Sequence, residues 1–248
     1  MGTLTPKTYI WAHRGASGHA PENTLEAFAL AAKMGADGVE LDVRFTKDGE
    51  IVIAHDEKLD RISNGQGLIG EYTYEQLLAF DFGYKFYGEV RGIKIATLRQ
   101  VYELLEPTGL MINIEIKGSD MDMPARCIEI AKEFHMEDRT HFSAFCHKLL
   151  LKVHEVAPEM QVAPLYSNNL VYAWDYCGFL QASAVHPLFS QVLEDEKYVE
   201  NCHNKGVKVN VWTANTEKDI QTLLEASCDG IITNYPDLAI KLRDEYCK

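Results

Sequence analysis

The sequence GVELDVRFTKDGEIVIAHD occupies residues 38–56, and its first half alternates apolar and polar side chains. A period of two is typical of a β-strand, so we expect one strand over residues 38–45. Residues 47–49 carry a turn signal, and residues 50–54 are expected to return as the hairpin partner. This stretch therefore predicts a strand that places carboxylates on one face and apolar side chains on the other.

Strand-length apolar runs alternate with helical patterns along the rest of the chain. Further strands are expected at residues 8–12, 110–116, 140–143, 161–165, 182–185, 207–212 and 230–233. Helices are expected at residues 25–35, 123–135, 148–156, 217–226 and 236–245. This βα alternation favours an α/β fold closed as a (β/α)8 TIM barrel over an open sheet. No composition break divides the chain, so residues 1–248 are predicted to form one domain, with a small insertion at about residues 58–95 after the second strand.

Composition limits the partners of the chain. Its 248 residues, 46% of them hydrophobic, are enough for one sizeable core. The net charge of −13, from 24 basic and 37 acidic residues, argues against nucleic acid and anionic membranes as partners, since both are polyanions. No stretch approaches the roughly 20 apolar residues of a membrane helix, residues 1–7 lack a signal-peptide pattern, and the six cysteines include no CxxC pair. We therefore expect a cytoplasmic protein with reduced thiols and no stable membrane insertion. The sequence sets no oligomeric state.

Three carboxylates form a candidate metal site. Glu40 and Asp42 are two residues apart on one strand, so their side chains project from the same face. Like charges side by side need neutralisation, either by water on a solvated edge strand or by a shared cation. A third carboxylate, Glu115, lies on another strand and favours the cation. Oxygen ligands suit a hard divalent metal ion, Mg²⁺ or Ca²⁺.

Two cationic side chains accompany these carboxylates. Lys117 lies two residues beyond Glu115 and shares its face, and Arg14 follows the first strand. Either residue can pair with a neighbouring carboxylate or offset charge on phosphate oxygens. The planar fork of Arg14 suits two phosphate oxygens better than a lysine does.

Two histidines, His13 and His55, end predicted strands at the rim where a barrel gathers the carboxylates. Singly, each is expected to be structural. As a pair they suit general acid–base catalysis, because cleavage of a phosphodiester needs one proton accepted and one donated. Three carboxylates near two histidines also fit a carboxylate–histidine metal site like that of sugar isomerases, which stays open as the competing chemistry.

Other aromatic residues carry weaker predictions. Trp212 ends the seventh barrel strand, where it is a candidate apolar wall of a substrate pocket. His186 follows a strand and is a weaker candidate for substrate contact, whereas His19 is expected to have a plain loop role. The remaining histidines are interpreted as surface or packing residues: His135, His141, His147, His154 and His203.

Several motifs stand in a fixed order along nearly the whole chain. They are His13-Arg14-Gly15, PENT at residues 21–24, Glu40-Leu41-Asp42, His55-Asp56, IEIK at residues 114–117, VWTAN at residues 211–215 and DGIITNYPD at residues 229–237. In this order and spacing the chain resembles the glycerophosphodiester phosphodiesterase family. The family usually has Pro-Thr-Leu where this chain has ATL at residues 96–98, and a Ser-Phe pair where it has SAF at residues 143–145. Neither departure touches a proposed catalytic group.

The resemblance implies a barrel enzyme of lipid and glycerol metabolism. It implies hydrolysis of a small-molecule glycerophosphodiester to glycerol 3-phosphate and an alcohol, with a divalent metal ion on the three carboxylates. His13 and His55 would be the acid–base pair, and Arg14 and Lys117 would contact phosphate. The alternatives are a phosphodiesterase of the same superfamily acting on lysophospholipid or sphingolipid headgroups, and a non-catalytic barrel that binds a phosphodiester or a metal.

Overall fold

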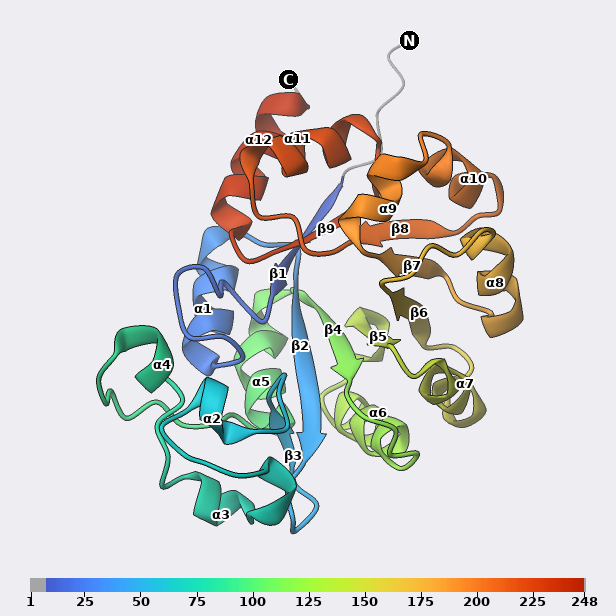
Figure 1. Ribbon diagram of the computed structural model, residues 1–248. Coiled ribbons are helices and arrows are strands. Elements are labelled where there is room, and N and C mark those ends of the chain that lie inside the picture. Colours follow the sequence, from blue (N-terminus) through green and yellow to red (C-terminus); the bar gives the residue numbers. More distant parts are fainter. Residues whose placement is uncertain (1–7, 248) are drawn as a thin grey trace.

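The computed structural model describes residues 8–247 and contains a closed barrel of parallel strands (Figure 1). The barrel strands are β1 (Tyr9–His13), β2 (Gly38–Phe45), β4 (Met111–Ile116), β5 (Thr140–Ala144), β6 (Gln161–Tyr166), β7 (Ala184–Pro187), β8 (Lys208–Val211) and β9 (Gly230–Thr233). Neighbours in this order pair in parallel, and the pairing of β1 with β9 closes the ring. The predicted (β/α)8 TIM barrel is therefore confirmed. Residues 1–7, on which the signal-peptide prediction depends, lie outside the described residues.

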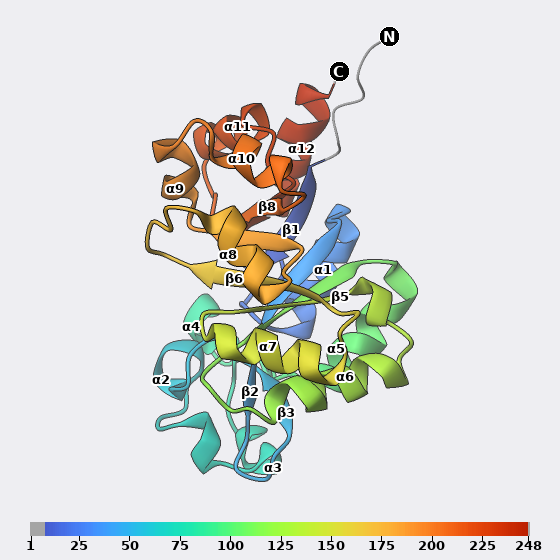
Figure 2. The same ribbon diagram turned by 90° about the vertical axis from the view of Figure 1, so that its right-hand side faces the viewer.

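The helices lie on the outside of the strands (Figures 1 and 2). They are α1 (Leu25–Met34), α5 (Leu98–Leu105), α6 (Met123–Glu133), α7 (His147–Val156), α8 (Ala173–Leu180), α9 (Phe189–Glu194), α10 (Tyr198–Asn204), α11 (Glu217–Glu225) and α12 (Pro236–Tyr246), with short 3-10 turns at Glu106–Thr108 and Glu137–Arg139. Local sequence sets their ends. The hydroxyl of Thr24 accepts a hydrogen bond from the backbone of Ala27 at the start of α1, and Gly35 ends that helix with a φ of 83°.

The alternating pattern of β2 places its apolar side chains in the core and its carboxylates on the other face of the strand. Val39, Leu41 and Val43 are fully buried in the main apolar cluster, which joins the strands to the surrounding helices. Glu40 and Asp42 therefore face the opposite side, the interior of the barrel. Within residues 8–247, no helix combines the length and the apolar character that crossing a membrane requires.

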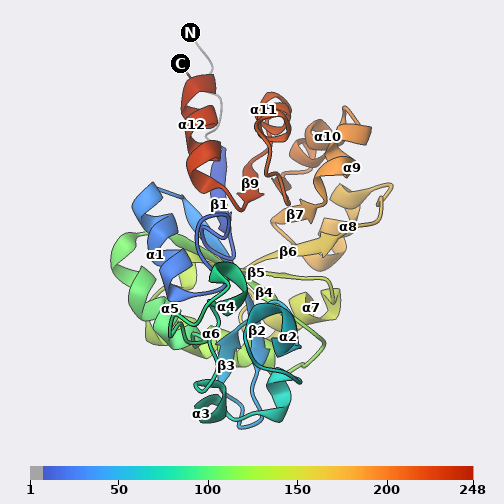
Figure 3. The same cartoon turned by 60° about the vertical axis from the view of Figure 1, so that its left-hand side comes forward.

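The segment expected to be an insertion contains only short helices: α2 (Leu59–Ile62), the 3-10 turn Ile69–Glu71, α3 (Tyr74–Leu77) and α4 (Tyr84–Tyr87). It lies at one side of the barrel, with α3 at its outer edge (Figures 1 and 3). The strand β3 (Ile51–Ile53) runs antiparallel to β2 beside it. A second apolar cluster holds the segment together: Val52, Ala54, Leu59, Ile62, Ile69, Leu77, Phe82, Ile93 and Ile95. Because the apolar side chains of α2 are buried in this cluster, the backbone of α2 is held in place relative to the barrel.

Candidate active site

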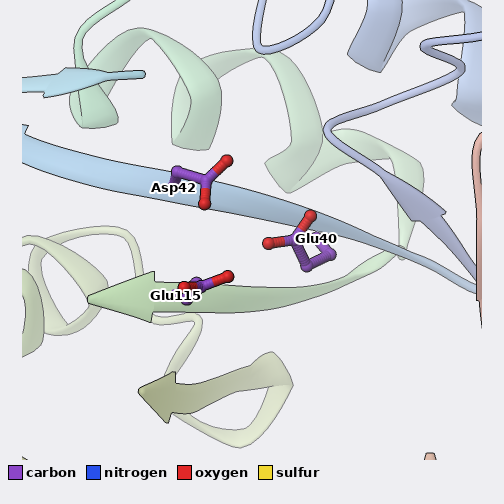
Figure 4. Close-up of side chains that lie close together, drawn as sticks. All are labelled: Glu40, Asp42 and Glu115. Atoms are coloured by element: carbon purple, nitrogen blue, oxygen red, sulfur yellow. The ribbon is translucent and has the colours of Figure 1, made fainter. Parts of the chain in front are cut away.

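The three predicted carboxylates meet inside the barrel. Asp42 on β2 lies directly opposite Glu115 on β4, and one oxygen from each of Glu40, Asp42 and Glu115 lies within 4.8 Å of the others. Figure 4 shows the three carboxyl groups gathered between the two strands. Their exposed fractions are 3%, 0% and 7%, so water cannot disperse the charge.

This crowding is visible in the proton affinities of the carboxyl groups. Burial, reinforced by the charge of Asp42, raises the pKa of Glu40 well above its ordinary value and that of Glu115 to about 7. A set of buried carboxylate oxygens that hold protons in the absence of a cation is suited to a hard divalent ion, which would replace those protons. The residues present therefore fit Mg²⁺ or Ca²⁺.

Two cations border the carboxylates. The Nζ atom of Lys117 lies 3.0 Å from Oδ1 of Asp42 and also pairs with Glu115. The Nε atom of Arg14 lies 3.4 Å from Oδ2 of Asp42, and the backbone N–H of Arg14 donates to Glu40 over 3.0 Å. Although burial opposes it, Lys117 and Arg14 hold the pKa of Asp42 well below its usual range. When all three carboxylates are ionised, they exceed the two cations by one negative charge, which a bound metal ion can offset.

The two histidines border the same cavity and have matching supports. The Nδ1 atom of His13 lies 2.6 Å from Oδ1 of Asn234, and Nδ1 of His55 lies 2.6 Å from Oδ1 of Asp56. With an oxygen accepting from each Nδ1–H, the Nε2 atom of each ring is left to exchange protons. Burial lowers the pKa of His13 to about 4 and also lowers the pKa of His55. Nε2 of His13 lies 4.0 Å from Glu40.

A cavity opens over these groups, and both charged and apolar side chains line it. Its lining consists of His13, Arg14, Glu40, His55, Asn113, Glu115, Lys117, Ser143, Phe145, Leu165, His186, Trp212 and Ile232. Phe145 meets the Trp212 ring edge-on, with 5.6 Å between ring centres. The indole N–H of Trp212 donates to the carbonyl of His186 over 2.8 Å, which fixes the orientation of this apolar wall.

The structure brings the predicted site residues together. Seven of the eight line the cavity, and the eighth, Asp42, lies buried against Lys117 and Arg14. The weaker candidate His186 also lines the cavity and is 4% exposed. His19 lies outside the cavity lining and instead pairs with Asp237 over 3.0 Å.

Sequence reasoning gave no role to several residues that support the site. Asn23, with a φ of 58°, donates its amide to Oδ2 of Asp42 over 2.8 Å, and Asn234 supports His13. Both lie in motifs that were singled out, the PENT segment and residues 229–237, so the motifs were the available signal. Phe145 lies where the chain departs from the usual Ser-Phe spacing. Nothing in the periodicity marks Arg61, whose contacts with Glu22 and Asp56 link two loops of the site.

Comparison with known proteins agrees with the motifs. Residues 13–238 match the model of the glycerophosphoryl diester phosphodiesterase family. A glycerophosphodiester phosphodiesterase from Caldanaerobacter subterraneus subsp. tengcongensis is 38% identical over 239 residues, which cover 95% of this chain and 98% of the relative. A phosphodiesterase from Oleispira antarctica, solved in complex with the product sn-glycerol-3-phosphate, has a TM-score of 0.90 and 29% identity, with 95% of this chain and 96% of that chain covered. A putative glycerophosphoryl diester phosphodiesterase from Silicibacter pomeroyi shares the fold, with a TM-score of 0.88 at 23% identity over 97% of this chain and 94% of that chain. The chain belongs to the glycerophosphoryl diester phosphodiesterase family.

Proposed function

We propose that this chain is a metal-dependent glycerophosphodiester phosphodiesterase, which releases glycerol 3-phosphate and an alcohol. The observation that carries the proposal is the convergence of three buried carboxylates, two cations and two histidines on one cavity. The family of the chain, and the product sn-glycerol-3-phosphate bound to the Oleispira antarctica relative, support the substrate class. Absence of nucleic acid and a cytoplasmic location stay predictions from the sequence.

Glu40, Asp42 and Glu115 would hold the divalent ion, which is Mg²⁺ or Ca²⁺ in this proposal. When bound, such an ion supplies Lewis-acid stabilisation to phosphate oxygens. Arg14 and Lys117 then neutralise the charge that builds up on the non-bridging oxygens, because both line the cavity. The contacts of both cations with Asp42 keep them oriented before the substrate arrives.

His13 and His55 carry the protons. Each has its Nδ1 atom held by an oxygen, so one Nε2 atom accepts the proton of the attacking oxygen and the other donates to the leaving alcohol. The attacking oxygen in this hypothesis is the substrate hydroxyl beside the esterified oxygen, since an internal nucleophile has a high effective concentration. The first product is then a cyclic phosphate, which water opens in a second step. Direct attack by water is the alternative path.

Trp212 is proposed as a substrate-binding residue. Its ring and that of Phe145 give the cavity an apolar part, which lies beside the charged groups, since Nζ of Lys117 is 5.9 Å from the centre of the Phe145 ring. Carbon atoms of the glycerol or alcohol part would pack there while the phosphate faces the cations.

One assay tests the proposal. Release of the headgroup alcohol is measured with glycerophosphocholine, glycerophosphoethanolamine and a lysophospholipid, with and without a chelator, before and after Mg²⁺ or Ca²⁺ is restored. Glycerol 3-phosphate is measured as the second product of the first two substrates. We expect turnover of the first two substrates that chelation abolishes and metal restores. Full activity after exhaustive chelation would contradict the metal assignment, and turnover of the lysophospholipid alone would favour the alternative substrate class. Glu129→Gln, on the exposed face of α6, serves as a variant with unchanged activity.

A further inference from the structure

One guanidinium group outside the cavity lining holds two carboxylates that each support a site residue. Arg61 lies on α2, and its Nη1 and Nη2 atoms donate to the two oxygens of Glu22 over 2.9 and 2.8 Å. Its Nε atom pairs with Oδ2 of Asp56. All three nitrogens of the fork are therefore used, in the planar geometry that suits carboxylates.

Each carboxylate also accepts a hydrogen bond from a residue that lines the cavity. Oδ1 of Asp56 accepts from Nδ1 of His55 over 2.6 Å, and Oε1 of Glu22 accepts from Nη1 of Arg14 over 3.0 Å. A continuous path of hydrogen bonds thus runs from the proposed acid–base histidine through Arg61 to the proposed phosphate-binding arginine.

We propose that Arg61 is a positioning residue, which sets the orientation of His55 through Asp56 and that of Arg14 through Glu22. The inference rests on the proposed function, since it assigns to Arg61 the orientation of a proposed acid–base residue and of a proposed phosphate-binding residue. An arginine of the helical segment 58–95 thereby takes part in the geometry of the barrel site.

The local structure supplies what positioning requires. Leu59 and Ile62, on either side of Arg61, are buried in the second apolar cluster, so the backbone that carries the side chain is fixed. The hydrogen bond from Arg61 also holds the pKa of Asp56 at about 2, so Asp56 stays an acceptor for His55 at neutral pH. Support of this kind fixes the tautomer and ring orientation of a histidine.

Stability alone is a weak explanation for this arrangement. The side chain of Arg61 is 47% exposed, and exposed ion pairs contribute little to the free energy of folding. Positioning differs from folding in its consequences, because a shift of a catalytic group by about 1 Å can cost 100-fold in rate. Arg61→Met should therefore change turnover far more than the melting temperature.

The test is a double-mutant cycle on the metal-loaded enzyme. We expect Arg61→Met to lower kcat about 10- to 100-fold in the wild-type background and by a clearly smaller factor beside His55→Ala, where only its effect through Arg14 remains. Arg99→Met is the matched control. Arg99 also forms a bidentate ion pair, with Glu133, and its side chain is similarly exposed. It lies on α5, on the outside of the barrel. Its loss should leave kcat unchanged.

Two results would overturn the proposal: full kcat in Arg61→Met, or an equal loss of kcat with and without the His55 ring. If Arg61→Met does not fold, the same cycle is run with Arg61→Lys, which keeps the charge and loses the fork.

A second measurement separates this proposal from the proposed function. In ¹⁵N spectra of the imidazoles, the share of the Nδ1–H tautomer of His55 should fall in Arg61→Met and stay unchanged in Arg99→Met. This signal does not depend on activity, so it still tests the role of Arg61 if His55→Ala proves fully active. If the share of the Nδ1–H tautomer of His55 is unchanged in Arg61→Met, Arg61 does not orient His55 and the proposal is refuted.

Discussion

The metal-free carboxylate cluster should make the stability of the protein depend on pH through Glu115. Its pKa is raised from 4.5 to about 7 by burial and by the neighbouring charge of Asp42. Because the folded protein holds a proton that the unfolded chain releases, this stabilisation is fully present below about pH 4.5. It decreases as the pH rises through 7 and is constant above. Glu115→Gln removes the titrating group and should remove this decrease.

The magnitude follows from the size of the change in pKa. A rise from 4.5 to about 7, at about 1.4 kcal/mol for each pH unit, corresponds to about 3 kcal/mol. The carboxyl group is almost fully buried, so solvent screening reduces this value little. Between pH 5 and pH 8 without metal, the wild type should therefore lose about 3 kcal/mol of unfolding free energy relative to Glu115→Gln.

Urea denaturation of both proteins in a chelating buffer, repeated at each pH, measures this difference directly. Adding Mg²⁺ or Ca²⁺ should stabilise the wild type by about 2.7 kcal/mol at 100 times the dissociation constant, and stabilise Glu115→Gln much less. Glu129→Gln is the control, since Glu129 is exposed and lies outside the carboxylate cluster. A difference between wild type and Glu115→Gln that stays constant with pH would refute the reasoning, as would equal stabilisation of both proteins by metal.

Three further outcomes are expected. His13→Ala and His55→Ala should each lower kcat by roughly 10²–10⁴-fold while metal still raises the melting temperature; loss of that rise would make the histidine a metal ligand. Burial lowers the pKa of His186 to about 3, so the folded state keeps this ring neutral while the unfolded chain takes up a proton below about pH 6.5. With metal present, the unfolding free energy of the wild type should fall relative to that of His186→Asn by up to about 1.4 kcal/mol for each pH unit between pH 6 and pH 4. Urea unfolding at each pH measures this, and a difference between the two proteins that stays constant with pH would contradict it. A substrate analogue without the hydroxyl beside the esterified oxygen should be hydrolysed far more slowly, and an undiminished rate would exclude the cyclic phosphate in favour of direct attack by water.

The barrel, and the position of the eight proposed site residues close to one another, could be predicted because their signals are local. The alternation along β2 assigns Glu40 and Asp42 to one face and Leu41 to the other, whatever the rest of the chain does. The ends of parallel strands in a closed barrel then gather His13 and Lys117 at the same rim. These steps need only the strand period and the chain topology.

The supports of the site could not be predicted because they depend on barrel closure and on irregular loops. The contact between His13 and Asn234 joins residues 221 positions apart, across the pairing of β1 with β9. Arg61 lies on a helix of four residues, which is too short for a helical period to show in the sequence. Its orientation depends on the second apolar cluster, whose members are spread between residues 52 and 95 and pack together only in the folded protein.

The balance of charge in the cavity connects the metal to the choice of substrate. Glu40, Asp42 and Glu115, when ionised, exceed the charges of Arg14 and Lys117 by one negative unit. Without a cation, Glu40 and Glu115 offset this excess by holding protons, because burial and the charge of Asp42 raise the pKa of both groups, and a bound divalent ion would replace those protons. A divalent ion reverses the balance to one positive unit, which matches the single charge of a diester. In the proposed function a diester would therefore neutralise the metal-loaded cavity, whereas the doubly charged monoester product would give it one excess negative charge, which would favour product release.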